Sequence, residues 1–250
     1  MKMGYLFWGW YTIGLILMLT YEVPDLLHFS NGLFLVFFAM YALTLERQEL
    51  RSKNLQRHAS LSIWARAGIV AVSTYILEWF GTETGYPFGT YEYTDTLSIF
   101  GEAVPIAIGF AWIGVMVMSV LMSTGKTLLT RALQTGFWAM LLDLVLDPAA
   151  FANEFWLWSG TGFYAGIPLQ NFISWFGAAF LLSFLFPLYH EGRDSRPSRS
   201  TVFLYQGMLA MFGLLSLKEG LVVPALISVL GIAAAEGVHR YASSPKKQMV

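Results

Sequence analysis

Apolar residues dominate the chain in long runs, and short polar stretches separate these runs. Most runs approach the roughly 20 residues that a helix needs to cross a hydrocarbon core of about 30 Å. We therefore expect an all-α, polytopic transmembrane bundle of about eight helices that forms a single integral membrane domain over residues 1–250. Seven helices are the alternative, because the second run is short and the last is rich in small residues. The eight predicted helices cover about residues 4–21, 30–45, 61–79, 102–121, 127–146, 169–188, 201–217 and 221–238.

The first run follows Lys2, as the apolar region of a signal peptide would. Its apolar stretch is long, however, and no cleavage site of small residues follows it. We expect a retained helix at this position.

Composition supports a membrane location. Hydrophobic residues make up 56% of the chain and charged residues 12%, about half of the ~25% charged share of soluble domains. Cysteine is absent, which excludes disulfides, thiolate nucleophiles and cysteine-ligated haem or iron–sulfur clusters. The four histidines are scattered without a metal-ligand spacing, so no metal site is expected. Nucleic acid is not an expected partner.

Charge is distributed unevenly between the connections. Lys and Arg gather after the second, fourth, sixth and last runs, so the positive-inside rule predicts that both termini are cytoplasmic. Arg66, inside the third run, is expected to snorkel to that same side. The other connections contain no Lys or Arg and should face outward; their acidic residues are Glu22, Asp25, Glu83, Glu92, Asp95, Asp147 and Glu154.

The third and fifth runs are each followed by a similar outward-facing stretch. Each helix ends in carboxylates, a loop rich in Gly, Trp and Tyr follows, and the next helix begins with a proline seven residues before a tryptophan. VPIAIGFAW at 104–112 corresponds to IPLQNFISW at 167–175, and TGYPFG at 84–89 corresponds to TGFYAG at 161–166. The pattern predicts two helical hairpins related as a parallel repeat; coincidence in a biased composition is the alternative.

Three carboxyl groups are candidates for chemistry. Glu78 and Asp143 lie on the last turns of predicted helices, where an ionisable group is costly unless it is paired or functional. Asp143 and Asp147 are four residues apart and share a helix face, and Pro148 predicts that the helix ends there. Such a pair suits either Mg²⁺ binding with a diphosphate or acid catalysis by a carboxyl that holds a proton.

The residues around these carboxyl groups suggest a binding pocket. Aromatic rings stabilise a carbocation by about 0.5–2 kcal/mol per ring, and an acid in an aromatic pocket suits protonation of an alkene in a polyene or isoprenoid. A membrane-interface aromatic belt is the alternative for the loop aromatics, and packing is the alternative for the helix tryptophans. The candidate substrate-binding residues are Glu83, Tyr86, Phe88, Tyr91, Tyr93, Trp112, Trp156, Trp158, Tyr164, Asn171 and Trp175.

These residues resemble the membrane-integral carotenoid biosynthesis family that includes the carotenoid 1'-hydratases of bacteria and the bisanhydrobacterioruberin hydratase of haloarchaea. The resemblance covers residues 75–176, which we take as the catalytic core. It rests on Glu78 with TGYPFGTYEY, then VPIAIGFAW, DLVLDP, W-x-W and GFYAGIPLQNFISW.

The resemblance implies a multi-pass enzyme of a prokaryotic cell membrane that adds water across the terminal C1=C2 bond of an acyclic carotenoid or apocarotenoid, without a cofactor. Membrane lipid and other carotenoid biosynthesis enzymes are the implied partners. We expect a carboxyl group to protonate C2 and water to capture the tertiary cation at C1. Glu78, Asp143 and Asp147 are the candidates for the acid and for positioning the water, and Asn171 either completes the water site or caps a helix.

Two other functions remain open. One is a membrane isoprenoid cyclase or a Mg²⁺-dependent prenyl-transferring enzyme, although the acidic side lacks basic residues for a diphosphate. The other is an isoprenoid or lipid transporter built around the repeated hairpins. The predicted orientation places the carboxylates outside, whereas an enzyme that attaches a nucleotide sugar to the alcohol would act most easily at the cytoplasmic face.

Overall fold

The computed structural model describes residues 2–21, 29–55, 61–97, 103–189 and 196–242. Within these residues the chain forms eight helices, which confirms the predicted all-α bundle. The helices are α1 (Lys2–Thr20), α2 (Phe29–Ser52), α3 (Ile63–Thr84), α4 (Ala107–Met122), α5 (Leu128–Ala152), α6 (Leu169–Ser183), α7 (Arg199–Lys218) and α8 (Val222–Tyr241); two strands, β1 (Tyr91–Tyr93) and β2 (Trp156–Trp158), accompany them. Glu22, Asp25, His28, His58 and His190 lie outside the described residues.

Five helices are long and apolar enough to cross a membrane, namely α1, α2, α5, α7 and α8. The short helices α4 and α6 have 16 and 15 residues, fewer than the sequence pattern predicted for either. Almost all of α4 is buried among its neighbours. Helix α4 begins five residues later than predicted, and α6 ends five residues earlier than predicted.

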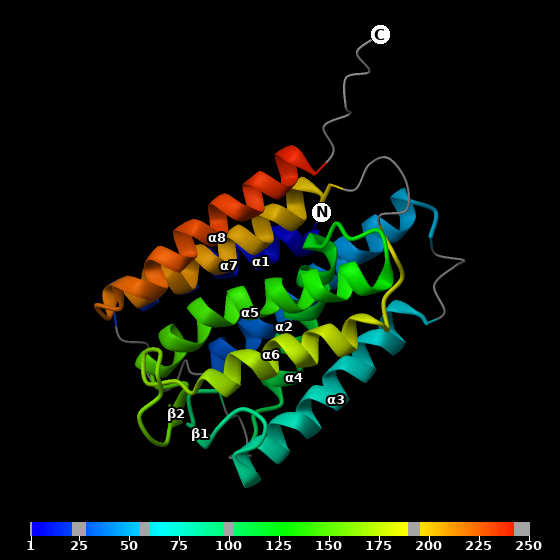
Figure 1. The fold of residues 1–250 in the computed structure, drawn as a ribbon. Helices are drawn as coiled ribbons and strands as arrows, with labels where there is room; N and C mark the ends of the chain where they lie inside the picture. The colour runs from blue at the N-terminus through cyan, green and yellow to red at the C-terminus, as the bar shows by residue number, and fades with distance from the viewer. Residues whose placement is uncertain (1, 22–28, 56–60, 98–102, 190–195, 243–250) are drawn as a thin grey trace.

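The helices lie roughly along one direction (Figure 1). Helices α7 and α8 pack side by side along one side of the bundle, and α3 lies along the opposite side, with α5 and α6 between them. The beginning of α1 and the end of α8 lie at the end of the bundle remote from β1 and β2. The two ends of the described chain thus lie at the same end of the bundle, as an even number of crossings requires.

The two connections that precede α4 and α6 meet each other. Strands β1 and β2 pair antiparallel, with Tyr91 opposite Trp158 and Tyr93 opposite Trp156. Deeper in the bundle, the rings of Trp112 and Trp175 stack with centroids 4.1 Å apart. The stacked tryptophans occupy corresponding places in the two predicted hairpins, whereas β1 follows TGYPFG and β2 precedes TGFYAG.

Helix α5 continues past Pro148, and the prediction that it ends at Asp147 is wrong. A proline within a helix cannot donate to the carbonyl four residues earlier, which here belongs to Leu144. The hydroxyl of Tyr164 donates to that carbonyl at 2.8 Å instead. A side chain from a later loop thereby compensates for the missing N–H, as occurs in membrane helices, and the helix runs on to Ala152.

The prediction that Arg66 snorkels to the interface is also wrong. Its side chain is 1% exposed and is paired with Glu46, which also accepts a hydrogen bond from the Tyr189 hydroxyl at 2.6 Å. The sequence pattern ended the second helix at residue 45, whereas α2 continues to Ser52. Glu46 is therefore inside the bundle, where it neutralises the arginine.

Candidate functional site

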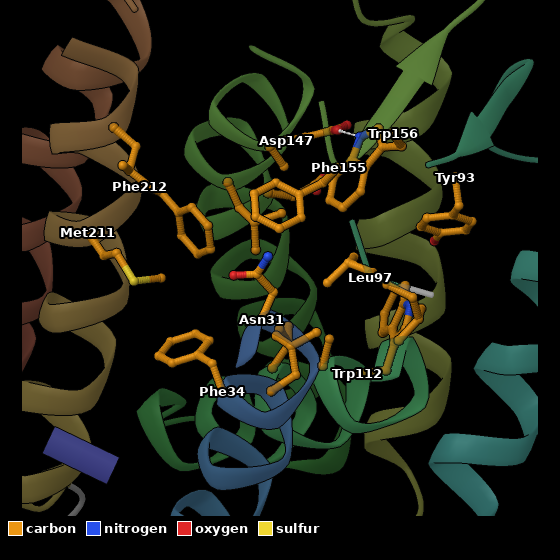
Figure 2. A pocket seen from close by; sticks show the side chains of 18 of the residues that line it. Asn31, Phe34, Tyr93, Leu97, Trp112, Asp147, Phe155, Trp156, Met211 and Phe212 are labelled. Atoms are coloured by element: carbon orange, nitrogen blue, oxygen red, sulfur yellow. Dashed lines mark hydrogen bonds between the residues drawn. The ribbon is translucent and has the colours of Figure 1, made fainter. Parts of the chain in front are cut away.

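An apolar cavity lies inside the bundle at the end that carries β1 and β2 (Figure 2). Its volume of about 150 Å³ is roughly ten times the 10–15 Å³ that a single water requires. Residues from every helix except α8 line it, together with both strands. The three carboxyl groups selected from the sequence, Glu78, Asp143 and Asp147, are all part of the lining.

Glu78 enters the cavity from α3 and accepts three hydrogen bonds. Tyr91 and Tyr93 donate their hydroxyls to Oε2, the latter at 2.9 Å, and the indole N–H of Trp112 donates to Oε1 at 2.8 Å. Gly81, one turn further along α3, makes room for this arrangement, because a Cβ there would lie 2.9 Å from Cδ2 of Phe88 and 3.3 Å from the Tyr91 hydroxyl. Hydrogen bonds of this kind favour the ionised form of a carboxyl group.

Asp147, on α5, also accepts three hydrogen bonds. The indole N–H groups of Trp156 and Trp158, both on β2, donate to Oδ1 at 2.5 and 3.3 Å. The side-chain amide of Asn171, on α6, donates to Oδ2 at 2.6 Å. Because Gly89 has a φ of 119° and a Cβ there would lie 3.0 Å from the Trp158 ring, this turn needs glycine to bring the indole into place.

Asp143 differs from the other two carboxyl groups. It is fully buried one turn before Asp147, and the Asn171 amide donates to its Oδ2 at 2.9 Å. Its Oδ1 is buried and has no hydrogen-bond partner among the described residues. A buried ionised oxygen without a partner is costly, so this oxygen is the natural place for a proton.

The charged residues that line the cavity are all acidic. None of the described residues that line the cavity is Lys, Arg or His. Three carboxylates without a cation would repel one another strongly in an apolar surrounding, so the cluster is expected to hold at least one proton. In the part of the chain that the structure describes, no three or more His, Cys, Asp or Glu side chains are grouped so as to hold a metal ion.

Aromatic rings surround the carboxyl groups. Tyr91 lies against Trp158, with ring centroids 4.9 Å apart, and Tyr93 meets Trp156 edge to face at 5.9 Å. Burial, together with the neighbouring Glu78, raises the pKa of both tyrosines, so their hydroxyls remain protonated donors at neutral pH. Much of the remaining wall is apolar, with Phe34, Leu97, Phe155, Met211 and Phe212 (Figure 2).

The structure separates the residues selected from the sequence into two groups. Glu83 and Tyr86 are exposed and do not line the cavity, and Tyr164 lies behind α5, where burial raises its pKa to about 12. Asn171 bridges the two aspartates, whereas Pro168 occupies the cap position of α6. The residues that line the cavity together are Glu78, Phe88, Tyr91, Tyr93, Trp112, Asp143, Asp147, Trp156, Trp158, Asn171 and Trp175.

Sequence reasoning missed the walls that α1, α2 and α7 contribute. Asn31, on the first turn of α2, presents its amide to the cavity in Figure 2, and Nδ2 donates weakly to the Thr96 carbonyl at 3.4 Å. A polar amide at the start of an apolar run was the available signal. The apolar residues of α1 and α7 carried no such signal, because lipid-facing and cavity-facing positions look alike in a membrane helix.

A family model described as carotenoid biosynthesis protein matches residues 30–234 of this chain. The chain belongs to the carotenoid biosynthesis protein family. The match includes all three carboxyl groups and every lining residue from α2 to α7. Helix α1 precedes the matched residues.

A curated relative supports the same assignment. The chain is 33% identical over 122 residues to a protein named bisanhydrobacterioruberin hydratase from Haloarcula japonica. The match covers 44% of this chain and 41% of that relative, so the chain spans less than half of the relative's length. No solved structure matches the chain significantly.

Proposed function

We propose that this protein is a cofactor-independent hydratase that adds water to the terminal C1=C2 bond of an acyclic carotenoid or apocarotenoid end group. The observation that carries the proposal is the contrast between the carboxyl groups. Glu78 and Asp147 each accept three hydrogen bonds, whereas the buried Oδ1 of Asp143 has no partner among the described residues. One cavity thus combines two carboxylates that each accept several hydrogen bonds with a carboxyl group suited to hold a proton.

In the proposed reaction the Asp143 carboxyl is the acid. Its proton is transferred to C2, the π electrons form the new C–H bond, and a tertiary cation remains at C1. A water molecule attacks C1 through its oxygen and then loses a proton to the carboxylate cluster, which restores the acid. The net change is the addition of one water to the substrate, with no oxidation or reduction.

The surroundings of Asp143 suit a cationic intermediate. The stacked Trp112 and Trp175 rings and the rings of β1 and β2 line the cavity, and the face of an aromatic ring stabilises a cation by roughly 0.5–2 kcal/mol. The carboxylates of Glu78 and Asp147 add electrostatic stabilisation from positions that their donors fix. Asn171, which bridges the aspartates, is the proposed orienting group for the water.

The prenyl-transferring alternative has less support. A diphosphate group is normally held by Arg or Lys, and the described lining has neither. The relative's name and the apolar lining both favour a neutral polyene, dissolved in membrane lipid of a prokaryotic cell. Other enzymes of carotenoid biosynthesis, which would supply or consume this pigment, are the proposed partners.

The proposal is tested by pigment analysis in a lycopene-producing host. The wild type should yield pigments that have gained one or two waters, identified by mass spectrometry. Asp143→Asn should lower their formation roughly hundredfold or more, which is the usual contribution of general acid catalysis. Asp95→Asn is the matched control, because Asp95 is exposed at the same end of the bundle.

Two results would count against the proposal. Full turnover by a folded Asp143→Asn variant would remove Asp143 from the acid's role. Absence of any hydrated product with the wild type, across lycopene and shorter acyclic polyenes, would refute the hydratase.

A further inference from the structure

Helix α1 forms one wall of the cavity, although it is packed loosely. Phe7 is the one buried residue among those that the structure describes in α1. Six α1 residues nevertheless line the cavity, namely Trp10, Tyr11, Gly14, Leu15, Leu17 and Met18. The catalytic cavity is thus separated from the surrounding lipid by a single helix.

At Gly14 this wall has no side chain. It lines the cavity, and a Cβ added there would meet no atom within 4 Å. One turn away, Leu17 also lines the cavity and is 37% exposed. The lining therefore continues from the carboxyl groups, past Gly14, to the outer surface of the bundle.

Hydrogen bonds hold α1 on either side of this position. The Tyr11 hydroxyl donates to the Gly207 carbonyl of α7 at 2.8 Å, and the Lys218 ammonium donates to the Met18 carbonyl at 2.8 Å. Gly14 lies between these two contacts, about one helical turn from each. The contacts fix α1 against α7, and the glycine between them leaves the space open.

We propose that the cavity opens to the membrane hydrocarbon at Gly14 and that the polyene chain of the substrate passes through this opening. The inference rests on the proposed function, because a polyene is the occupant. A cavity of about 150 Å³ holds an end group and not a long polyene. The remainder of the chain must extend outward. The lining that α1, α2 and α7 contribute is rich in apolar residues, with Leu15, Phe34, Leu35, Met211, Phe212 and Leu215.

The opening also lies in a part of the chain that the family pattern does not cover. The family match begins at residue 30, whereas Gly14 lies in α1. The carboxyl groups and the lining residues of α2 and α7 are within the matched residues, whereas Gly14 is not.

Filling the opening tests the inference. Gly14→Trp should lower hydration of lycopene roughly tenfold or more, an increase of about 1.4 kcal/mol in the barrier. Gly9→Trp is the matched control, because Gly9 lies on the same helix and also has nothing within 4 Å, yet does not line the cavity. Equal loss, or no loss, in the two variants would overturn the proposal.

A labelling experiment keeps the inference independent of turnover. Because the chain has no cysteine, Gly14→Cys and Gly9→Cys each introduce one thiol, whose rate of reaction with a membrane-permeant maleimide can be measured in lipid nanodiscs. Lycopene should slow labelling at residue 14 several-fold and leave residue 9 unchanged. Protection of residue 14 without any hydrated product would support the opening and refute the hydratase. Hydration by the wild type without protection of residue 14 would support the hydratase and refute the opening.

Discussion

At the scale of single residues, the three carboxyl groups are distinguished by their donors. Glu78 and Asp147 each accept three hydrogen bonds, and Asp143 accepts one. The sequence predicted the identity of all three and most of the rings around them. It did not predict which donor meets which oxygen, because those contacts depend on the pairing of β1 with β2, two segments more than sixty residues apart.

The donors to Glu78 provide a prediction at this scale. Tyr93→Phe keeps the ring but removes the hydroxyl that donates to Oε2 at 2.9 Å, so a buried carboxylate loses one of its three partners. We expect kcat for carotenoid hydration to fall roughly tenfold, while the melting temperature changes little. Steady-state kinetics of the purified protein in nanodiscs would measure this.

Tyr86→Phe is the control for that change. Tyr86 belongs to the same connection but is 68% exposed and does not line the cavity. Its loss of a hydroxyl should leave kcat unaltered. If the two variants behaved alike, the hydrogen bond to Glu78 would have no special role.

At the scale of elements, α5 shows why the predicted helix end was wrong. The expectation that a helix ends before a proline, here Pro148, considers only the neighbouring backbone. The carbonyl that Pro148 leaves without its N–H partner is satisfied by Tyr164, sixteen residues later in the chain. Continuation of α5 places Asp147 inside the bundle rather than at its surface.

A double-mutant cycle measures this compensation. Tyr164→Phe leaves the Leu144 carbonyl without its partner and should lower the free energy of unfolding by about 1–3 kcal/mol. In a Pro148→Ala background the helix supplies its own N–H, so the same change should cost much less. Thermal denaturation of the four proteins in one detergent would give the coupling free energy.

An equal cost of Tyr164→Phe in both backgrounds would contradict this account of the helix. It would indicate that the hydroxyl stabilises the protein by another contact.

At the scale of the whole molecule, two hairpins supply the three carboxyl groups and the aromatic rings beside them, and the other helices except α8 complete the cavity. The apolar runs predicted eight helices and the all-α class, because the membrane imposes its length on each run. The repeated Pro, Gly and Trp motifs indicated the two hairpins whose carboxyl groups line the cavity. The enclosure by α1 and α7 was not predictable, since helix order around a bundle is set by packing among side chains that are mostly apolar, and for α2 Asn31 was the available signal.

The most direct test of the central claim is isotopic. Purified protein in nanodiscs is given lycopene in H₂¹⁸O, and separately in D₂O, and the product is analysed by mass spectrometry and NMR. Protonation followed by capture of water predicts ¹⁸O in the tertiary alcohol at C1 and one solvent deuterium bonded to C2. A product that carries neither solvent oxygen nor solvent deuterium at these carbons, or a product that forms only with a diphosphate substrate, would contradict the claim that the buried carboxyl groups hydrate the double bond.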